Sequence, residues 1–209
     1  MEEIFKKDRN SLSDEEIVYC VLKGHVDYFE VIYNRYAKKI YQKCLTFTKN
    51  KSESEDLLQE ILIKIFTNLY SFRNKSSFNT WVYSIAHFHC INYLKHNKTK
   101  FQKNTLSIED VLYIESEKTE QAEGDDDNDK FLFNLSVEEL KKVLDLLPVE
   151  DKAILLLKYQ DGLKINEICE VLELGESAVK MRIKRAKEKA RILAQKVQEN
   201  PNFHISYAK

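Results

Sequence analysis

Apolar side chains recur every three or four residues along much of the chain between residues 14 and 95. Such spacing places them on one face of an α-helix. The clearest run lies within residues 27–47, where the apolar positions are Phe29, Ile32, Tyr33, Tyr36, Ile40 and Cys44. We therefore predict a long amphipathic helix over residues 27–47.

The next predicted helix begins after a polar break at Asn50 and Lys51. Ser52 is followed three residues later by Glu55, which is the spacing of a capping box. This pattern predicts a helix from Ser52 to about residue 69.

Residues 70–79 are polar and predict a loop. A further helix is expected over residues 80–95, with larger side chains at helical spacing at Trp81, Ile85, Phe88 or His89, Ile91 and Leu94. We expect Trp81 and Tyr83 to be buried. The first helical domain is therefore predicted over residues 14–96, after an N-terminal tail over residues 1–13.

The composition changes after residue 96. Residues 115–130, ESEKTEQAEGDDDNDK, carry eight acids against two lysines. A run with that charge cannot bury enough apolar surface to fold, so residues 97–134 are predicted to be a flexible acidic linker. Two roles stay open for it. It is either a solubilising spacer or a competitor that occupies the chain's own basic surfaces until DNA displaces it.

A second helical domain is predicted over residues 135–197, followed by a tail over residues 198–209. Ser136 and Glu139 have capping-box spacing and open a helix to about residue 146. Pro148 stands where the next helix starts.

That helix ends before Gly162. The remaining pattern predicts a short helix over residues 165–172, a turn over residues 173–175 and a long helix from residue 176 to about residue 195.

The long C-terminal helix combines a narrow apolar stripe with concentrated positive charge. The stripe consists of Val179, Ile183, Ala186, Ala190 and Leu193. At about 100° per residue, a basic flank is expected at Lys180, Lys184, Lys187 and Arg191. A solvated, salt-bridged helix would carry more acids, and a membrane-surface helix would have a broader apolar face. A short helix, a turn containing Gly175 and a basic helix instead indicate a helix-turn-helix that binds DNA.

The composition agrees with an all-α protein. Hydrophobic residues make up 43% of the chain and charged residues 32%, with four Gly and two Pro. No apolar run approaches the length of a membrane span, and the N-terminal residues lack the apolar segment of a signal peptide. We therefore expect a cytoplasmic protein without membrane insertion.

The cysteines and histidines do not suggest a metal site. Cys20, Cys44, Cys90 and Cys169 are scattered and are expected to be reduced, partly buried thiols. His87 and His89 would point to different faces of a helix. We predict neither a metal nor a cofactor.

The C-terminal half resembles a known family. The stretch LDLLPVEDKAILLLKYQDGLKINEICEVLELGESAVKMRIKRAKEKARIL is similar to region four, the promoter-binding region, of bacterial sigma factors. The resemblance is to the extracytoplasmic-function (ECF) group of the sigma-seventy family.

The N-terminal half resembles the same family independently. FEVIYNRYAKKIY is similar to region 2.1, ESEDLLQEILIKIF to region 2.2, and SSFNTWVYSIAHFHCINYLK to regions 2.3 and 2.4. The order of the motifs and the unmatched linker also fit the ECF group. The resemblance therefore implies a protein that binds core RNA polymerase, directs it to promoters and helps melt the minus-ten region.

The resemblance also implies which residues bind each partner. Core polymerase contacts are expected at Asp56, Gln59 and Glu60. Minus-ten DNA contacts are expected at Phe78, Asn79, His87, Phe88, Asn92 and Lys95. Minus-thirty-five DNA contacts are expected at Ser177, Lys180, Met181, Arg182, Lys184, Arg185 and Lys187. An anti-sigma factor is the customary further partner of this group.

Several positions depart from the family pattern. Ser84 and His87 stand where many relatives have Arg or Lys, and Phe88 stands where Asn is usual. Met181 replaces a small polar residue, and Glu176 adds an acid to the first turn of the basic helix. The promoter preference of relatives therefore cannot be transferred to this chain.

These patterns fit three functional classes to different degrees. The first is a sigma factor, which is not an enzyme because the polymerase supplies catalysis. The alternative is a free-standing helix-turn-helix regulator whose N-terminal helices dimerise or sense a ligand. The segment SEDLLQE favours the sigma factor, because a repressor has no use for a polymerase-docking motif. A helical nuclease is disfavoured because no acid cluster typical of a metal site lies near a basic groove.

Overall fold

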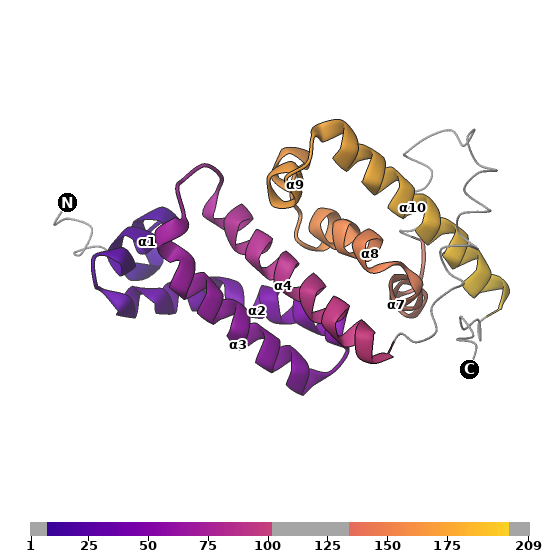
Figure 1. Ribbon diagram of the computed structural model, residues 1–209, viewed down its shortest axis with the longest axis horizontal. Helices are drawn as coiled ribbons and strands as arrows, with labels where there is room; N and C mark the ends of the chain where they lie inside the picture. The colour runs from indigo at the N-terminus through magenta and orange to yellow at the C-terminus, as the bar shows by residue number, and fades with distance from the viewer. Residues whose placement is uncertain (1–7, 102–133, 201–209) are drawn as a thin grey trace. The chain divides into compact units, whose positions relative to one another are not determined.

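The computed structural model describes residues 8–101 and 134–200, and every regular element in these residues is helical (Figure 1). The chain divides into two compact units, residues 1–94 and residues 95–209. The expected all-α fold with two helical domains is thus confirmed. Most of the predicted linker, residues 102–133, lies outside the described residues, as do residues 1–7 and 201–209.

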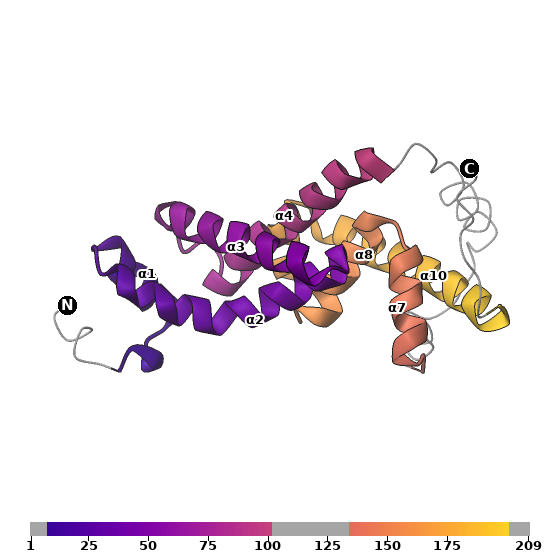
Figure 2. The ribbon, with the colours of Figure 1, turned by 90° about the horizontal axis from the view of Figure 1, so that it is seen from below.

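The first unit is built from four α-helices and shorter 3₁₀ turns. Their bounds are η2 Arg9–Ser11, α1 Asp14–Leu22, η3 Val26–Tyr28, α2 Phe29–Thr48, α3 Lys51–Asn68, η4 Leu69–Ser71 and α4 Phe78–Phe101. Helices α2 and α3 lie side by side (Figures 1 and 2). Their facing residues, including Ile32, Ile40 and Ile61, are fully buried and form the centre of this unit.

The start of α3 differs from the prediction. The helix begins at Lys51, and the side chain of Asn50 accepts a hydrogen bond from the backbone N–H of Glu53 at 3.3 Å. The predicted capping box of Ser52 and Glu55 is therefore wrong. Lys49 ends α2 in the left-handed conformation, which leaves Asn50 extended and in the geometry of an N-cap.

Helix α4 also differs from its prediction, in both its length and its buried face. It runs from Phe78 to Phe101, beyond the predicted end at residue 95. Its buried face includes Val82, Ala86 and Cys90, whereas Trp81 and Ile85 are only half-buried. Tyr83 is buried as expected. Apolar residues occur on all sides of this helix, so their spacing alone did not select the buried face.

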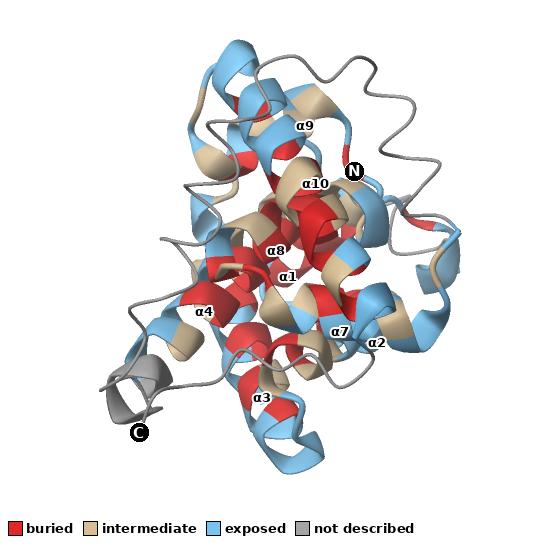
Figure 3. Cartoon of the chain, turned by 90° about the vertical axis from the view of Figure 1, so that its right-hand side faces the viewer, coloured by how far each residue is buried: buried red, intermediate tan, exposed pale blue. Residues whose placement is uncertain are grey.

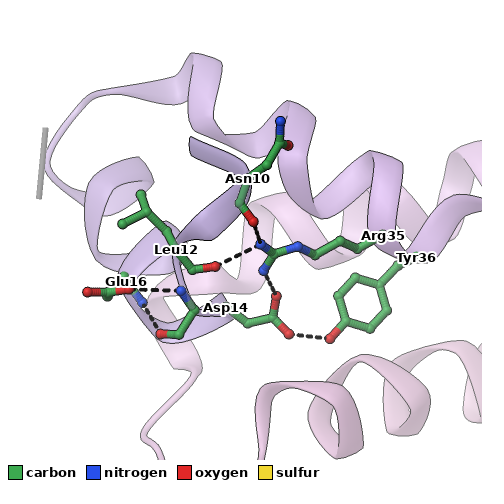
Figure 4. A network of polar contacts seen from close by, with 7 residues as sticks. Asn10, Leu12, Asp14, Glu16, Arg35 and Tyr36 are labelled. Carbon is green, nitrogen blue, oxygen red and sulfur yellow. Dashed lines mark hydrogen bonds and ion pairs between the residues drawn. The ribbon is translucent and has the colours of Figure 1, made fainter. Parts of the chain in front are cut away.

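A polar network holds residues 10–14 against α2 (Figure 4). The Arg35 guanidinium donates to the carbonyl oxygens of Asn10 and Leu12, at 2.9 and 2.7 Å, and to the Asp14 carboxylate at 2.6 Å. The Tyr36 hydroxyl donates to the second oxygen of Asp14. Burial, followed by this bond to Asp14, raises the pKa of Tyr36 above its ordinary value, which keeps the donor protonated. Leu12 is buried, so the end of the predicted N-terminal tail is part of the fold.

The second unit contains a further set of packed helices. Their bounds are α7 Val137–Leu146, α8 Val149–Leu155, a π-helical turn η5 Leu156–Gln160, α9 Ile165–Leu172 and α10 Glu176–Glu199. The predicted capping box at Ser136 is confirmed: its hydroxyl accepts from the Glu139 N–H at 3.2 Å, and the Glu139 carboxylate accepts from the Ser136 N–H at 2.8 Å. Helix α10 packs against α7, α8 and α9.

Figure 3 colours the residues by burial, with buried segments where helices pack together and exposed segments on the surface. The turn between α9 and α10 is short because Glu173 adopts the left-handed conformation that closes α9. Gly175 then serves as the N-cap of α10. The predicted short helix, turn and long helix are therefore confirmed, and α10 extends beyond its predicted end to Glu199.

Candidate nucleic-acid and protein interfaces

Helix α10 presents a basic surface opposite a buried stripe. All five predicted stripe residues, Val179, Ile183, Ala186, Ala190 and Leu193, are buried. The exposed side of the first turns carries Ser177, Lys180, Met181, Arg182, Lys184 and Arg185. The stripe fixes the rotation of the helix, so Met181, Lys184 and Arg185 project away from the core, while Arg182 lies at the edge of the exposed face.

Lys187 is an exception among the predicted DNA contacts. Only 3% of it is exposed, so its side chain lies within the unit rather than on the basic surface. Position 187 is about 80° from the middle of the buried stripe, close enough for the long aliphatic stem to be covered by its neighbours. We therefore correct the expected contact set by removing Lys187.

Charge pairs further restrict the basic surface. Lys180 Nζ lies 2.6 Å from the Glu176 carboxylate. This hydrogen bond raises the pKa of Lys180 and lowers the pKa of Glu176. Arg191, which the spacing placed on the basic flank, is half-buried and bonds to Glu188 at 2.6 Å. The cations that carry no such bond to an acid on α10 therefore include Lys184 and Arg185.

The motif that carries α10 is also well defined at its start. The Lys164 N–H donates to the Glu167 carboxylate at 2.8 Å and fixes the first turn of α9. Ile168 and Val171 of α9 are buried. The short helix α9 therefore packs against α10, in the arrangement of a helix-turn-helix.

Helix α3 has the second candidate surface. Asp56, Gln59 and Glu60 are exposed, as predicted. Leu57, Ile61 and Ile65, on the opposite side of the helix, are all buried.

The acidic side of α3 is connected to α4 by two contacts that the sequence did not reveal. His89 Nε2 lies 2.8 Å from the Glu60 carboxylate, and the Tyr93 hydroxyl donates to Glu53 at 2.8 Å. These contacts join residues far apart in sequence, so only the fold brings them together.

Helix α4 contributes the third candidate surface. Phe88 is 45% exposed, Asn92 and Lys95 are exposed, and Asn79 is half-buried. At about 100° per residue, Phe88, Asn92 and Lys95 fall within a sector of about 60°. An aromatic ring, an amide and a cation thus share one face.

Two of the expected minus-ten contacts are instead part of the core. Phe78 is 0% exposed and stacks on Trp81 with a 5.5 Å separation between ring centroids. His87 is 2% exposed. Neither side chain can reach DNA in this structure, so both are removed from the expected contact set. The cause is the rotation of α4, which turns these two positions inward.

The environment of His87 keeps its ring neutral. Burial, followed by the nearby Lys43 ammonium, lowers the pKa of His87 to about 3. Its Nδ1 atom has no hydrogen-bond partner within the described part of the chain. The Lys43 ammonium also lies 5.4 Å from the centre of the Tyr83 ring.

The remaining candidate chemistry is limited. The four cysteines are free thiols; three are buried and Cys169 is half-buried. Residues 8–101 and 134–200 contain no group of three or more His, Cys, Asp or Glu side chains placed to bind a metal ion. No helix in the same residues is long and apolar enough to cross a membrane.

Comparisons with known proteins define the class of these surfaces. Residues 32–100 match the family described as Sigma-70 region 2, and residues 137–189 match the family described as Sigma-70, region 4. Together these regions cover more than half of the chain. The first contains the candidate surfaces of α3 and α4, and the second contains the basic face of α10.

Characterised relatives and solved structures agree. The chain is 33% identical to the ECF RNA polymerase sigma factor SigW of Bacillus subtilis, over 82% of this chain and 91% of the relative. It is 31% identical to the ECF RNA polymerase sigma-E factor of Escherichia coli, over 85% of this chain and 92% of the relative.

The fold is similar to that of the sigma factor RpoE in its complex with the anti-sigma factor NepR from Bartonella quintana, with a TM-score of 0.56. The two sequences are 15% identical, and the match covers 80% of this chain and 96% of RpoE. It is also similar to CnrH in complex with the cytosolic domain of CnrY, with a TM-score of 0.61, 17% identity, and coverage of 88% and 97%.

The chain therefore belongs to the ECF group of the sigma-70 family of RNA polymerase sigma factors. It is a transcription initiation factor that directs RNA polymerase to promoters. The alternative of a free-standing regulator is not favoured, because both sigma regions are present in one chain and in the family order.

The neutral, buried His87 predicts a specific pH dependence of stability. An unfolded His with an ordinary pKa near 6.5 takes up a proton below that pH, whereas folded His87 stays neutral until about pH 3. Because only the unfolded chain takes up this proton, the free energy of unfolding decreases as the pH falls from 6.5 towards 3. Between pH 7 and pH 5 the loss from this residue is about 2 kcal/mol.

Urea unfolding followed by the fluorescence of Trp81, the single Trp of the chain, measures this loss for the first unit. The His87→Leu variant should lose less stability than the wild type over the same pH interval, by about 2 kcal/mol. Equal losses in both proteins would show that His87 is protonated in the folded state.

Proposed function

We propose that the three surfaces divide the work of transcription initiation. The acidic face of α3 binds core RNA polymerase, the exposed face of α4 binds the melted minus-ten strand, and the basic face of α10 binds the minus-thirty-five duplex. The observation that carries this proposal is that each matched sigma region exposes a face with the chemistry its partner requires. The protein is not an enzyme and needs no cofactor, because catalysis belongs to the polymerase. It acts where the polymerase and the chromosome are, in the cytoplasm.

The α3 face suits a basic protein partner. Asp56, Gln59 and Glu60 are exposed on a helix whose opposite side is buried. Carboxylates at this spacing can accept bidentate hydrogen bonds from arginines of a partner. The contact between His89 and Glu60 holds one carboxylate on α3 close to α4, so it limits the conformations available to that carboxylate before the polymerase binds.

The α4 face suits unstacked bases. Single-strand binding requires aromatic surfaces for stacking and cations for phosphates. Phe88 supplies an exposed ring, and Lys95 supplies an exposed cation about two turns further along the same face. Asn92, between them, offers an amide donor and acceptor for base edges.

The α10 face suits duplex DNA. Lys184 and Arg185 are exposed and can neutralise phosphates or donate to guanine acceptors in the major groove. One of the three N–H donors of Lys180 is bonded to Glu176, and the carboxylate beside it partly offsets the attraction of Lys180 for phosphates. The contribution of Lys180 is therefore smaller than that of a cation with no acidic neighbour.

We extend the proposal to a regulatory partner of the anti-sigma class. The solved structure of RpoE is a complex with such a factor. No surface of this chain is assigned to the partner.

The first test removes the acidic face of α3. Asp56→Ala combined with Glu60→Ala should weaken binding to core polymerase by about 2 kcal/mol, or about thirtyfold, because two charges at an interface are lost. Affinity is measured by fluorescence titration of labelled protein with core enzyme. Glu15→Ala combined with Glu30→Ala removes the same charge from exposed positions on α1 and α2, outside this face, and should bind normally. Equal affinity of the two double variants would refute the assignment of the α3 face.

The second test separates the two DNA surfaces. Lys180→Glu combined with Lys184→Glu should impair initiation on closed promoters that require the upstream element. On templates already opened at the minus-ten region the defect should be smaller, because binding no longer has to support melting. Phe88→Leu should lower permanganate reactivity of the minus-ten thymines on closed templates, since leucine cannot stack on a base, and Phe88→Tyr should restore it. The same defect in the lysine variant and in Phe88→Leu on both templates would contradict this division.

A further inference from the structure

Met181 has an unusual position on the recognition helix. It is 49% exposed, although methionine is an apolar residue. With Met181 placed at 0°, the buried Val179, Ile183 and Ala190 lie at about 160°, 200° and 180° around the helix axis. Met181 therefore stands at the middle of the face that points away from the core of its unit.

The surroundings of Met181 are polar. At about 100° per residue its neighbours on this face are Ser177, Lys184 and Arg185, all exposed. Apart from the single methyl group of the exposed Ala178, Met181 is the apolar side chain on this face, and it lies at the centre of a basic surface. A protein or membrane partner that buried Met181 would also have to cover these cations, whereas DNA provides phosphates for them on both sides of its groove.

We propose that Met181 makes the chain selective for thymine in the minus-thirty-five element, by packing its thioether against the C5 methyl group. This inference rests on the proposed placement of the α10 face in the major groove. The thymine methyl is the apolar group that base edges present in that groove, where guanine, cytosine and adenine present hydrogen-bonding groups. The long, flexible methionine side chain can follow the methyl group without an ideal docking angle.

The pair of Glu176 and Lys180 supports this selection. The 2.6 Å contact occupies the Lys180 ammonium in the first turn, where base edges are read. One N–H donor of Lys180, which could otherwise bind guanine, is therefore bonded to Glu176. Base reading then depends more on the next residue, Met181, which lies between Ser177 and Arg185 on the exposed face.

The test compares thymine with uracil, which differs only by lacking the C5 methyl group. Holoenzyme assembled from the full chain and core polymerase is bound to a promoter obtained by selection from genomic fragments. Each thymine of the minus-thirty-five element, on either strand, is replaced in turn by deoxyuridine. At one position the wild-type holoenzyme should lose about fourfold in affinity, the value of one buried methyl group.

Variants assign the effect to its side chain. Met181→Ala should bind the thymine promoter about as weakly as the wild type binds the uracil promoter, and should not distinguish the two. Met181→Leu should retain the discrimination. Lys184→Ala, the control, should weaken binding to both promoters and leave their ratio near fourfold, because it loses a phosphate contact rather than a methyl contact.

Each contrary outcome has a distinct meaning. Discrimination that persists in Met181→Ala, or a selected element without thymine, would overturn the role of Met181 and leave the placement of α10 intact. If Met181→Ala lost affinity for core enzyme in the absence of DNA, Met181 would be covered by a protein, and its role in base selection would also be overturned. Equal binding to a scrambled minus-thirty-five element would overturn the placement of α10 together with this inference.

Discussion

The rotation of α10 is fixed by a narrow stripe of small and aliphatic side chains, and the surface that we propose binds DNA depends on it. Val179, Ile183, Ala186 and Ala190 are all buried, and the two alanines allow close approach to neighbouring helices. A helix held in this way has one possible outer face. That face carries Lys184 and Arg185 with Met181 between them. Burial of the stripe therefore determines which side chains can meet DNA, before any property of the DNA is considered.

The same logic applies to α3 and α4, with a different result for each. Buried Leu57, Ile61 and Ile65 turn Asp56 and Glu60 outward, as the resemblance to the family implied. In α4 the core instead takes Phe78 and His87, and leaves Phe88 exposed. The resemblance to the family implies an Asn at the position of Phe88, so this chain exposes an aromatic ring where an amide was expected. A base preference carried over from relatives would miss this difference.

Sequence patterns predicted some elements well because their apolar positions were unambiguous. The short helix, turn and long helix of the C-terminal unit, and the capping box at Ser136, belong to this group. The face of α4 was misassigned because apolar residues surround that helix, so only tertiary packing chooses its rotation. Lys187 was misassigned because its position in the sequence predicts a surface residue, whereas its long aliphatic stem is buried beside the stripe. The contact between His89 and Glu60 depends on the fold and left no local signal.

The central claim is that this chain gives core RNA polymerase its choice of promoter. The most direct measurement is transcription in vitro from a genomic library, with core polymerase from the encoding organism, in the presence and absence of the purified chain. The account predicts new transcripts only when the chain is present, each starting downstream of a shared pair of sequence elements at fixed spacing. Transcripts that do not depend on the chain, together with protection of a palindromic site by the chain alone, would contradict it and identify a free-standing regulator.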